Sequence, residues 1–406
     1  MAADQEHGLT RTSQRNSGTE RGAGVTEDHH VVDPARVRFT FHLCTTYRTT
    51  PPPAIDPKSD MLEKRLECRK PAFEHLSLAY RLCTVSFIHE TRGGWYSSYL
   101  MSLFLDVYSP GQPINDHTLI HDGSIWHLFH IWLPPGITCP RKAGTNVAAA
   151  YASDHRDRVI GHATSRDLLT WDTLPDILPK TDAGWETCPG ANAPFVVKDR
   201  ESYVLFYSRY CNQDGIPFNI QQIGRATSDD LIHWEEDPEN PVFHPGDFWC
   251  PWKERSGDFF RPACCRDPHV IRYGPGWLLF YVAMTREPRV CAVAVASSED
   301  LRNWTDCGPV FTAPITDHGS EMIESPCVLF RDGQWHLFFT HGRQSFWTVG
   351  GTPFCFANPV SLGEIHAPEI FEWEGRWVIT HCGHDGGLSL AELRWGDVPE
   401  VIPFVR

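Results

Sequence analysis

The chain has 406 residues, of which 41% are hydrophobic and 12% aromatic, and a formal net charge of −15 at pH 7. This composition is sufficient for one large core, while the acidic balance, with no Lys/Arg run and no glycine-rich phosphate loop, argues against nucleic acid and acidic membrane surfaces as partners. The 14 cysteines include no Cys-x-x-Cys pair, so we expect buried thiols rather than a zinc site or a disulfide framework.

The first 100 residues differ in composition from the rest. Met1 to Val31 is rich in Ser, Thr, Gly, Arg and Glu, which predicts little order. We therefore expect a low-order N-terminal extension over residues 1–100 and a folded domain over residues 101–406. Two origins of the extension stay open: a natural flexible segment, or residues upstream of a translation start at Met101.

The sequence of the N-terminal extension also predicts where in the cell the protein is located. Met1 to Asn16 is polar and has no apolar signal-peptide core, so the sequence predicts a cytoplasmic protein. The most apolar stretch, Tyr99 to Val107, is too short to span a bilayer.

From Asn115 onward the chain repeats one pattern five times. A short apolar strand, a charged or glycine turn, an aromatic residue and a second apolar strand together predict a β-hairpin. The aromatic residues that open the second strands are Trp126, Tyr203, Trp277, Trp335 and Trp377.

Three of the hairpins are followed by a strand and the pattern Ser-x-Asp-Leu-x-x-Trp, at Ser165–Trp171, Ser228–Trp234 and Ser298–Trp304. A Ser followed by an acidic residue favours a tight side-chain-capped turn that leads to an outer strand. Each repeat is thus a four-stranded antiparallel unit, and five units around an axis predict an all-β fold, a five-bladed β-propeller.

Polar residues precede the first strand of every repeat, where the inner strand begins near the axis. Three of them, Asp116, Asp267 and Glu324, are carboxylates placed directly against apolar strands, at positions that the repeat makes equivalent. Crowded carboxylates have pKa values that are pushed apart, which provides the ionised and the protonated group that glycosidic bond cleavage requires. The alternative is that these acids cap turns or pair with Arg261 and Arg266.

These motifs resemble those of the five-bladed glycoside hydrolases of families 32, 43, 62 and 68, over Asn115 to Trp395. Arg266-Asp267-Pro268 resembles the Arg-Asp-Pro motif of families 32 and 68, and Glu324-Ser325-Pro326 resembles their Glu-Cys-Pro acid motif and the Glu-Gly-Pro of family 43. Asn115-Asp116 matches only the first two residues of the nucleophile motif Asn-Asp-Pro-Asn-Gly, because His117 replaces the proline. No C-terminal β-sandwich follows the fifth repeat, so fructan or sucrose specificity is not expected.

The resemblance implies a glycosidase that hydrolyses an O-glycosidic bond in a carbohydrate substrate. Asp116 would be the nucleophile or general base and Glu324 the general acid. Asp267 would bind substrate hydroxyls and keep Glu324 protonated, with Arg266 holding it in place. The remaining residues expected at the substrate are Asn115, Asn192, His366 and the loop residue Trp185, with Trp249 and Trp252 as further loop tryptophans that can stack on sugar rings.

No cofactor and no catalytic metal are expected. Some family 43 relatives place a histidine near a central cation, so the resemblance allows one structural cation near His384. The oligomeric state is not specified by the sequence.

Two other functions stay open. A non-catalytic carbohydrate-binding propeller would keep the aromatic residues and lose a catalytic residue. The replacement of the motif proline by His117 favours this alternative. A glycoside phosphorylase would need a basic phosphate pocket, for which Arg261, Arg266 and Arg343 are the candidates. A protein-interaction propeller is disfavoured, because neither a WD nor a kelch signature is present.

Overall fold

A computed structural model describes residues 103–132, 158–178, 190–213, 216–252, 265–313, 323–342, 344–382 and 386–405. These residues form strands and turns without any helix, so the described chain offers no helix that could cross a membrane. The expected extension over residues 1–100 lies outside the described residues.

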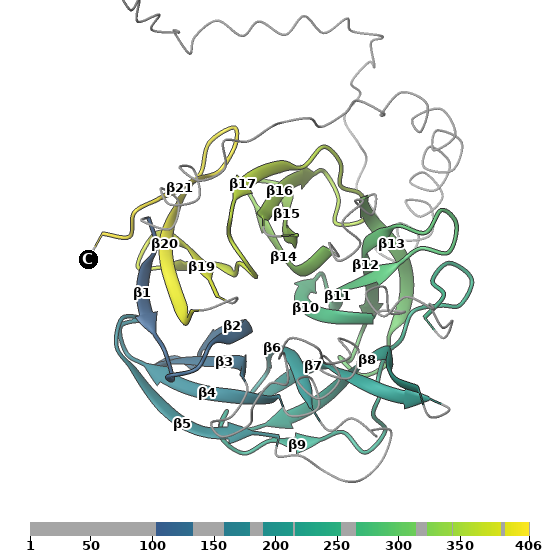
Figure 1. Cartoon of the computed structure of the whole chain (residues 1–406), viewed down its shortest axis with the longest axis horizontal. Coiled ribbons are helices and arrows are strands. Elements are labelled where there is room, and N and C mark those ends of the chain that lie inside the picture. The colour runs from purple at the N-terminus through teal and green to yellow at the C-terminus, as the bar shows by residue number, and fades with distance from the viewer. Residues whose placement is uncertain are drawn as a thin grey trace, which may run out of the picture. The chain divides into compact units, whose positions relative to one another are not determined.

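The strands form five antiparallel sheets around a central axis, which confirms the five-bladed propeller (Figure 1). In blades 1 to 4 the strands run outward from the axis in chain order. Blade 1 contains β2 (Ile114–His121), β3 (Trp126–Trp132), β4 (Val159–Ser165) and β5 (Trp171–Ile177). Blade 2 contains β6 (Ala191–Asp199), β7 (Ser202–Gln213), β8 (Ile216–Ser228) and β9 (Glu235–Glu236).

Blade 3 contains β10 (Cys265–Tyr273), β11 (Gly276–Met284), β12 (Cys291–Ser298) and β13 (Thr305–Ala313). Blade 4 contains β14 (Ile323–Arg331), β15 (Gln334–His341), β16 (Gln344–Gly350) and β17 (Val360–Gly363). Blade 5 contains β18 (Ile370–Trp373), β19 (Arg376–His381) and β20 (Leu388–Arg394), and its outer position is shared by β1 (Leu105–Tyr108) and β21 (Glu400–Ile402).

The ring closes through β1, which precedes blade 1 in the chain but pairs with β20 of blade 5. Leu105 lies opposite Leu390, and the Ser389 hydroxyl donates to Asp106 Oδ1 at 2.6 Å. Tyr108 then reaches the outer strand of blade 1, where its hydroxyl lies 3.1 Å from Thr173 Oγ1. This short strand therefore joins the last blade to the first.

The core lies in the seams between neighbouring blades. Phe129 and Leu205 pack between blades 1 and 2, Phe206 and Tyr281 between blades 2 and 3, and Phe280 and Phe339 between blades 3 and 4. The same arrangement continues from blade 4 to blade 5 and from blade 5 back to blade 1. Apolar side chains on both faces of each blade are thus removed from water.

The Ser-x-Asp-Leu-x-x-Trp pattern forms the expected capped turn. In the copy of blade 2, Asp230 Oδ1 accepts the backbone N–H groups of Ile232 and His233, both at 2.8 Å, and the Trp234 indole donates to the Leu231 carbonyl at 3.1 Å. Leu231 has a positive φ of 63°, as do its equivalents Leu168 and Leu301.

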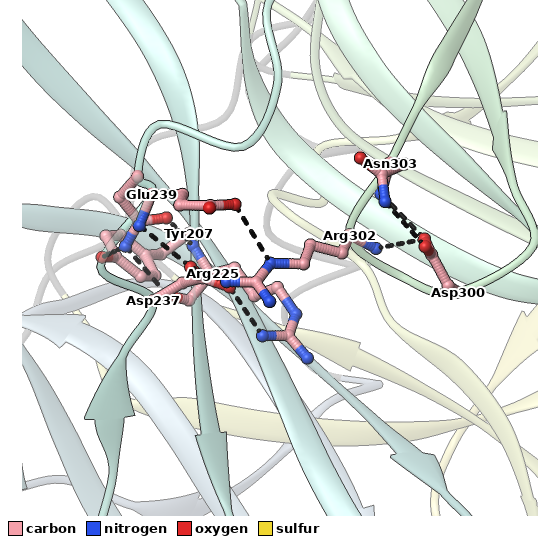
Figure 2. A network of polar contacts seen from close by, with 8 residues as sticks. Tyr207, Arg225, Asp237, Glu239, Asp300, Arg302 and Asn303 are labelled. Carbon is pink, nitrogen blue, oxygen red and sulfur yellow. Dashed lines mark hydrogen bonds and ion pairs between the residues drawn. The ribbon is translucent and has the colours of Figure 1, made fainter.

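A polar network connects blades 2 and 3 at their outer edge (Figure 2). Arg302, in the capped turn of blade 3, donates to Asp237 at 2.7 Å, and Arg225 of β8 donates to the other oxygen of the same carboxylate at 2.9 Å. Burial acts to raise the pKa of Asp237, but the backbone N–H of Glu239 and the guanidinium groups of Arg302 and Arg225 outweigh it and hold that pKa below its usual value. The network fastens the two blades that carry Asn192 and Asp267.

Candidate active site

A bulge repeats near the start of every inner strand, and it creates the site. One residue with positive φ stands at this point in each blade: Asp116 (22°), Ala193 (45°), Asp267 (55°), Ser325 (49°) and Ala367 (48°). The strand pairing shifts at the same place in β2, β6, β10 and β14. A bulge re-aims side chains, and backbone strain of this kind is often found at functional sites.

The bulge also corrects one expectation. Asp116 and Asp267 occupy equivalent positions, but Glu324 stands one residue earlier, before the bulge residue Ser325. The expectation that all three carboxylates are equivalent is therefore wrong. The true equivalents of Glu324 in the other blades are Asn115, Asn192, Arg266 and His366.

Residues from all five blades line an open hollow of about 290 Å³ at the inner ends of the blades. The lining residues are Asp116, His117, Ala193, Pro194, Phe195, Asp267, Pro268, Ser325, Pro326, Ala367 and Glu369.

Ser325 connects the two aspartates. Its hydroxyl donates to Asp116 Oδ1 at 2.7 Å, and its backbone N–H donates to Asp267 Oδ2 at 3.0 Å. The Ser208 hydroxyl accepts the backbone N–H of Asp267 at 2.9 Å, which holds the bulge of blade 3 against blade 2. The two carboxylates therefore have defined orientations.

Arg266 connects Asp267 with Glu324. Its Nη2 donates to Glu324 Oε1 at 2.9 Å, while its Nε lies 3.7 Å from Asp267 Oδ2. The other oxygen of Glu324 lies 3.6 Å from His366 Nε2. His366 Nδ1 donates in turn to the Cys382 carbonyl at 2.9 Å, so this ring is held from both sides.

These contacts separate the pKa values of the two buried carboxyl groups. Burial acts to raise the pKa of Glu324, but Arg266 and His366 outweigh it and lower that pKa to about 2. Burial raises the pKa of Asp267 to about 7, with the charges of Asp116 and Glu324 adding to the effect and Arg266 opposing it. At neutral pH the site thus contains an ionised Glu324, while Asp267 keeps a proton far more readily than Glu324 does.

This charge distribution differs from the expectation that Asp267 keeps Glu324 protonated. The physical reason is the position of the Arg266 guanidinium, which lies closer to Glu324 than to Asp267. The expectation that the two groups have separated pKa values is confirmed, and the assignment of the proton to Glu324 is wrong for the site without substrate.

The other expected residues have different positions. Asn192 is buried and donates to the Gly190 carbonyl at 3.3 Å, and Asn115 Oδ1 is buried with no partner among the described residues. Trp252 is buried in the seam of blades 2 and 3, and the Trp249 indole donates to Asp306 there at 2.6 Å. Neither tryptophan lines the hollow. Outside the described residues lie Trp185, His384, Arg261 and Arg343.

Sequence reasoning missed Ser325, Glu369 and the contacts of His117. His117 bonds Thr380 Oγ1 at 2.7 Å and Cys382 Sγ at 2.9 Å, so the residue that replaces the family proline fastens blade 1 to blade 5. Burial lowers its pKa to about 3, so the ring is neutral. Burial also raises the pKa of Glu369 to about 8. Glu369 could have been found from the sequence, because it is a carboxylate that directly follows Pro368 in an otherwise apolar strand.

A five-bladed propeller with carboxylates from three blades at its axis defines the class: a propeller of the glycoside hydrolase type. Residues 148–349 match the family model described as glycosyl hydrolases family 32 N-terminal domain. The chain thus resembles the five-bladed glycoside hydrolases of family 32.

Individual relatives agree with this class. The chain is 28% identical over 236 residues to a probable sucrose-6-phosphate hydrolase of Psychromonas ingrahamii, a match that covers 57% of this chain and 34% of the relative. The chain spans about a third of the length of the curated relatives it matches.

Solved structures share the fold. Sucrose-6-phosphate hydrolase from Lactobacillus gasseri superposes with a TM-score of 0.56 at 16% identity, over 76% of this chain and 67% of that one. A thermostable family-43 glycoside hydrolase superposes with a TM-score of 0.53 at 16% identity, over 72% of this chain and 94% of that one.

Proposed function

We propose that this protein is a glycoside hydrolase that cleaves an O-glycosidic bond at the axial hollow, with Asp116, Asp267 and Glu324 as its catalytic carboxylates. The observation that carries the proposal is the joining of the three groups: Ser325 bonds Asp116 and Asp267, and Arg266 contacts Asp267 and Glu324. Acids that only cap their own turns would not share partners across blades.

Asp116 is the nucleophile in this proposal. It lines the hollow, and the hydroxyl of Ser325 orients one of its oxygens and leaves the other for attack on the anomeric carbon. The attack breaks the bond to the leaving oxygen and forms a glycosyl ester, which water then hydrolyses. Two displacements give a product with retained anomeric configuration.

Glu324 is the general acid, by its motif, and it must gain a proton before the leaving group departs. Asp267 is the carboxyl group of the same site that holds a proton near neutral pH. Substrate binding that moves the Arg266 guanidinium away from Glu324 would raise the pKa of Glu324 and let it act as the acid. In the second displacement Glu324 takes a proton from the attacking water. No cofactor is required.

The family 32 match supports hydrolysis over phosphorolysis and over carbohydrate binding without catalysis. Relatives described as a probable sucrose-6-phosphate hydrolase and a β-fructofuranosidase make fructosides the first substrates to assay. Arabinosides, xylosides and galactosides complete the panel, because the nucleophile motif departs from that of family 32 at His117.

The test uses the full chain with that panel of glycosides. Glu324→Gln should lower turnover of substrates with poor leaving groups by about 10²–10⁴-fold, the usual contribution of a general acid. Asp116→Asn should be inactive and should recover activity with azide, because the cavity and the acid remain. Asp172→Asn, which changes an exposed carboxylate on β5, is the control and should retain activity. Full activity of Asp116→Asn, or an inverted product from the unaltered enzyme, would contradict the proposal.

A further inference from the structure

A second ring of side chains follows the bulge. The second residue after the bulge residue is Thr118 in blade 1, opposite Phe129, and Phe195 in blade 2, opposite Phe206. In blades 3, 4 and 5 the equivalent residues are His269, Cys327 and Glu369. The five positions are therefore related by the symmetry of the propeller.

Three of these side chains carry metal-ligating atoms and come from adjacent blades. The ring nitrogens of His269, the sulfur of Cys327 and the carboxylate of Glu369 offer one ligand atom each, and these atoms all lie within 4.8 Å of one another. His269 and Cys327 are 5% and 2% exposed. Glu369 lines the hollow, so the cluster lies between the buried ring and the open site.

The orientation of His269 is suited to a ligand. Its Nε2 lies 3.0 Å from the Val328 carbonyl and 3.1 Å from the Val328 amide. When Nε2 carries the proton and donates to the carbonyl, the lone pair of Nδ1 points to the cluster, which is the usual support for a metal-ligating histidine. Nδ1 is buried, and no described residue within hydrogen-bonding distance satisfies it.

An ionised cluster would carry negative charge with little compensation. The one ion-pair contact of Glu369 among the described residues is His269 Nδ1, at 4.0 Å from Oε1. An unpaired buried carboxylate is costly, and a thiolate beside it would add to the cost. A divalent cation would offset both negative charges and leave the ring neutral.

We propose that His269, Cys327 and Glu369 bind a divalent cation of the zinc class, which fastens blades 3, 4 and 5 to one another at the propeller axis. One nitrogen, one sulfur and one oxygen ligand suit zinc better than calcium or magnesium, which prefer oxygen. The hollow beside Glu369 leaves room for water as a fourth ligand. This site shares no residue with the cation expected near His384, and it does not depend on the proposed glycosidase activity.

Binding requires the three ligand atoms to move closer together. Bond lengths of about 2.0–2.3 Å in a tetrahedral site place ligand atoms about 3.3–3.6 Å apart. His269 Nδ1 and Glu369 Oε1 are 4.0 Å apart, and all three ligand atoms lie within 4.8 Å of one another, so side-chain rotations must shorten these separations by up to about 1.5 Å.

The test begins with the unaltered full chain, treated with a chelator and then given Co²⁺ or Zn²⁺ alone. We expect one equivalent of Co²⁺ to produce a thiolate-to-cobalt charge-transfer absorption and the strong visible bands of four-coordinate cobalt, both removed by Zn²⁺. X-ray absorption of the zinc form should show one sulfur at about 2.3 Å and the remaining ligands at about 2.0 Å. No sulfur, or more than one, would overturn the proposal without any variant.

Variants then assign the ligands. Cys327→Ser should lose the charge-transfer absorption, while Cys265→Ser, which alters another fully buried cysteine in the described chain, should keep it. Glu369→Gln preserves the shape of the side chain and should weaken Zn²⁺ binding by roughly tenfold or more, judged from the effect of losing even an outer partner. A charge-transfer band that survives Cys327→Ser, or a Zn²⁺ affinity unchanged by Glu369→Gln, would show that the metal binds elsewhere.

Discussion

The guanidinium group of Arg266 determines which carboxyl group of the site carries a proton. It lies 2.9 Å from Glu324 and 3.7 Å from Asp267, so it stabilises the ionised form of the first more than that of the second. The sequence predicted that Asp116, Asp267 and Glu324 come together, because each precedes an apolar inner strand. It did not predict the charge distribution, because a bulge offsets Glu324 by one residue and side-chain contacts across blades leave no local signal.

Replacing Arg266 should move the pH dependence of activity in a known direction. Arg266 lowers the pKa of both Glu324 and Asp267, so Arg266→Gln should raise both and shift the basic limb of kcat/KM to higher pH. Asp267→Asn removes a negative charge near Glu324 and should shift the basic limb to lower pH. Arg266→Lys retains the charge and is the control. Profiles of kcat/KM against pH that coincide for Arg266→Gln and Asp267→Asn would refute this account.

At the scale of the strand and turn, the sequence predicted elements whose hydrogen bonds join neighbouring residues. It did not predict a strand pairing between residues far apart in the chain. The capped turn at Ser228–Trp234 was predicted because each of its hydrogen bonds joins residues no more than three apart. The hairpin turns at Asp332-Gly333 and Glu374-Gly375 have positive φ at both residues, as the sequence indicated. The pairing of β1 with β20 joins residues 280 or more positions apart and has no counterpart in the repeat.

Two truncations should distinguish the extension from the closing strand. Removing residues 1–100 should leave a cooperative thermal transition, because β1 begins at Leu105 and stays in place. Removing residues 1–109 also deletes β1 and the buried Tyr108, and loss of a buried aromatic side chain costs about 3–5 kcal/mol. The longer truncation should therefore melt at a clearly lower temperature, measured by circular dichroism. Equal melting temperatures would mean that β1 does not close the ring in solution.

At the scale of the whole molecule, the five repeats predicted the fold because each repeat brings its own hairpin and aromatic residue. The same symmetry predicted which residues lie near the propeller axis. Symmetry does not predict how the blades differ, since the equivalent positions hold side chains of unrelated chemistry: Thr118, Phe195, His269, Cys327 and Glu369. Function in this propeller therefore lies in departures from the repeat.

Buried histidines should make the stability of the folded domain rise with pH on the acid side. Burial lowers the pKa of His117 and His162 to about 3 and that of His130 and His269 to about 4, against 6.5 for a free ring. Between about pH 4 and 6.5 the unfolded chain therefore binds more protons at these four sites, and the free energy of unfolding rises with pH. Asp267 and Glu369, with pKa values raised from 3.8 and 4.5 to about 7 and 8, act in the opposite direction: their contribution to stability falls as pH rises from about 4 to 8.

Since four histidines outnumber the two carboxyl groups, the chelator-treated protein should have its highest melting temperature near pH 6.5. Each net proton changes the free energy of unfolding by about 1.4 kcal/mol per pH unit. His162→Gln removes one of the four groups and should flatten the rise between pH 4.5 and 6.5 by about one proton, whatever its effect on absolute stability. Thermal transitions followed by circular dichroism at constant ionic strength measure both slopes. A slope that His162→Gln leaves unchanged would mean that this histidine is already charged in the folded protein.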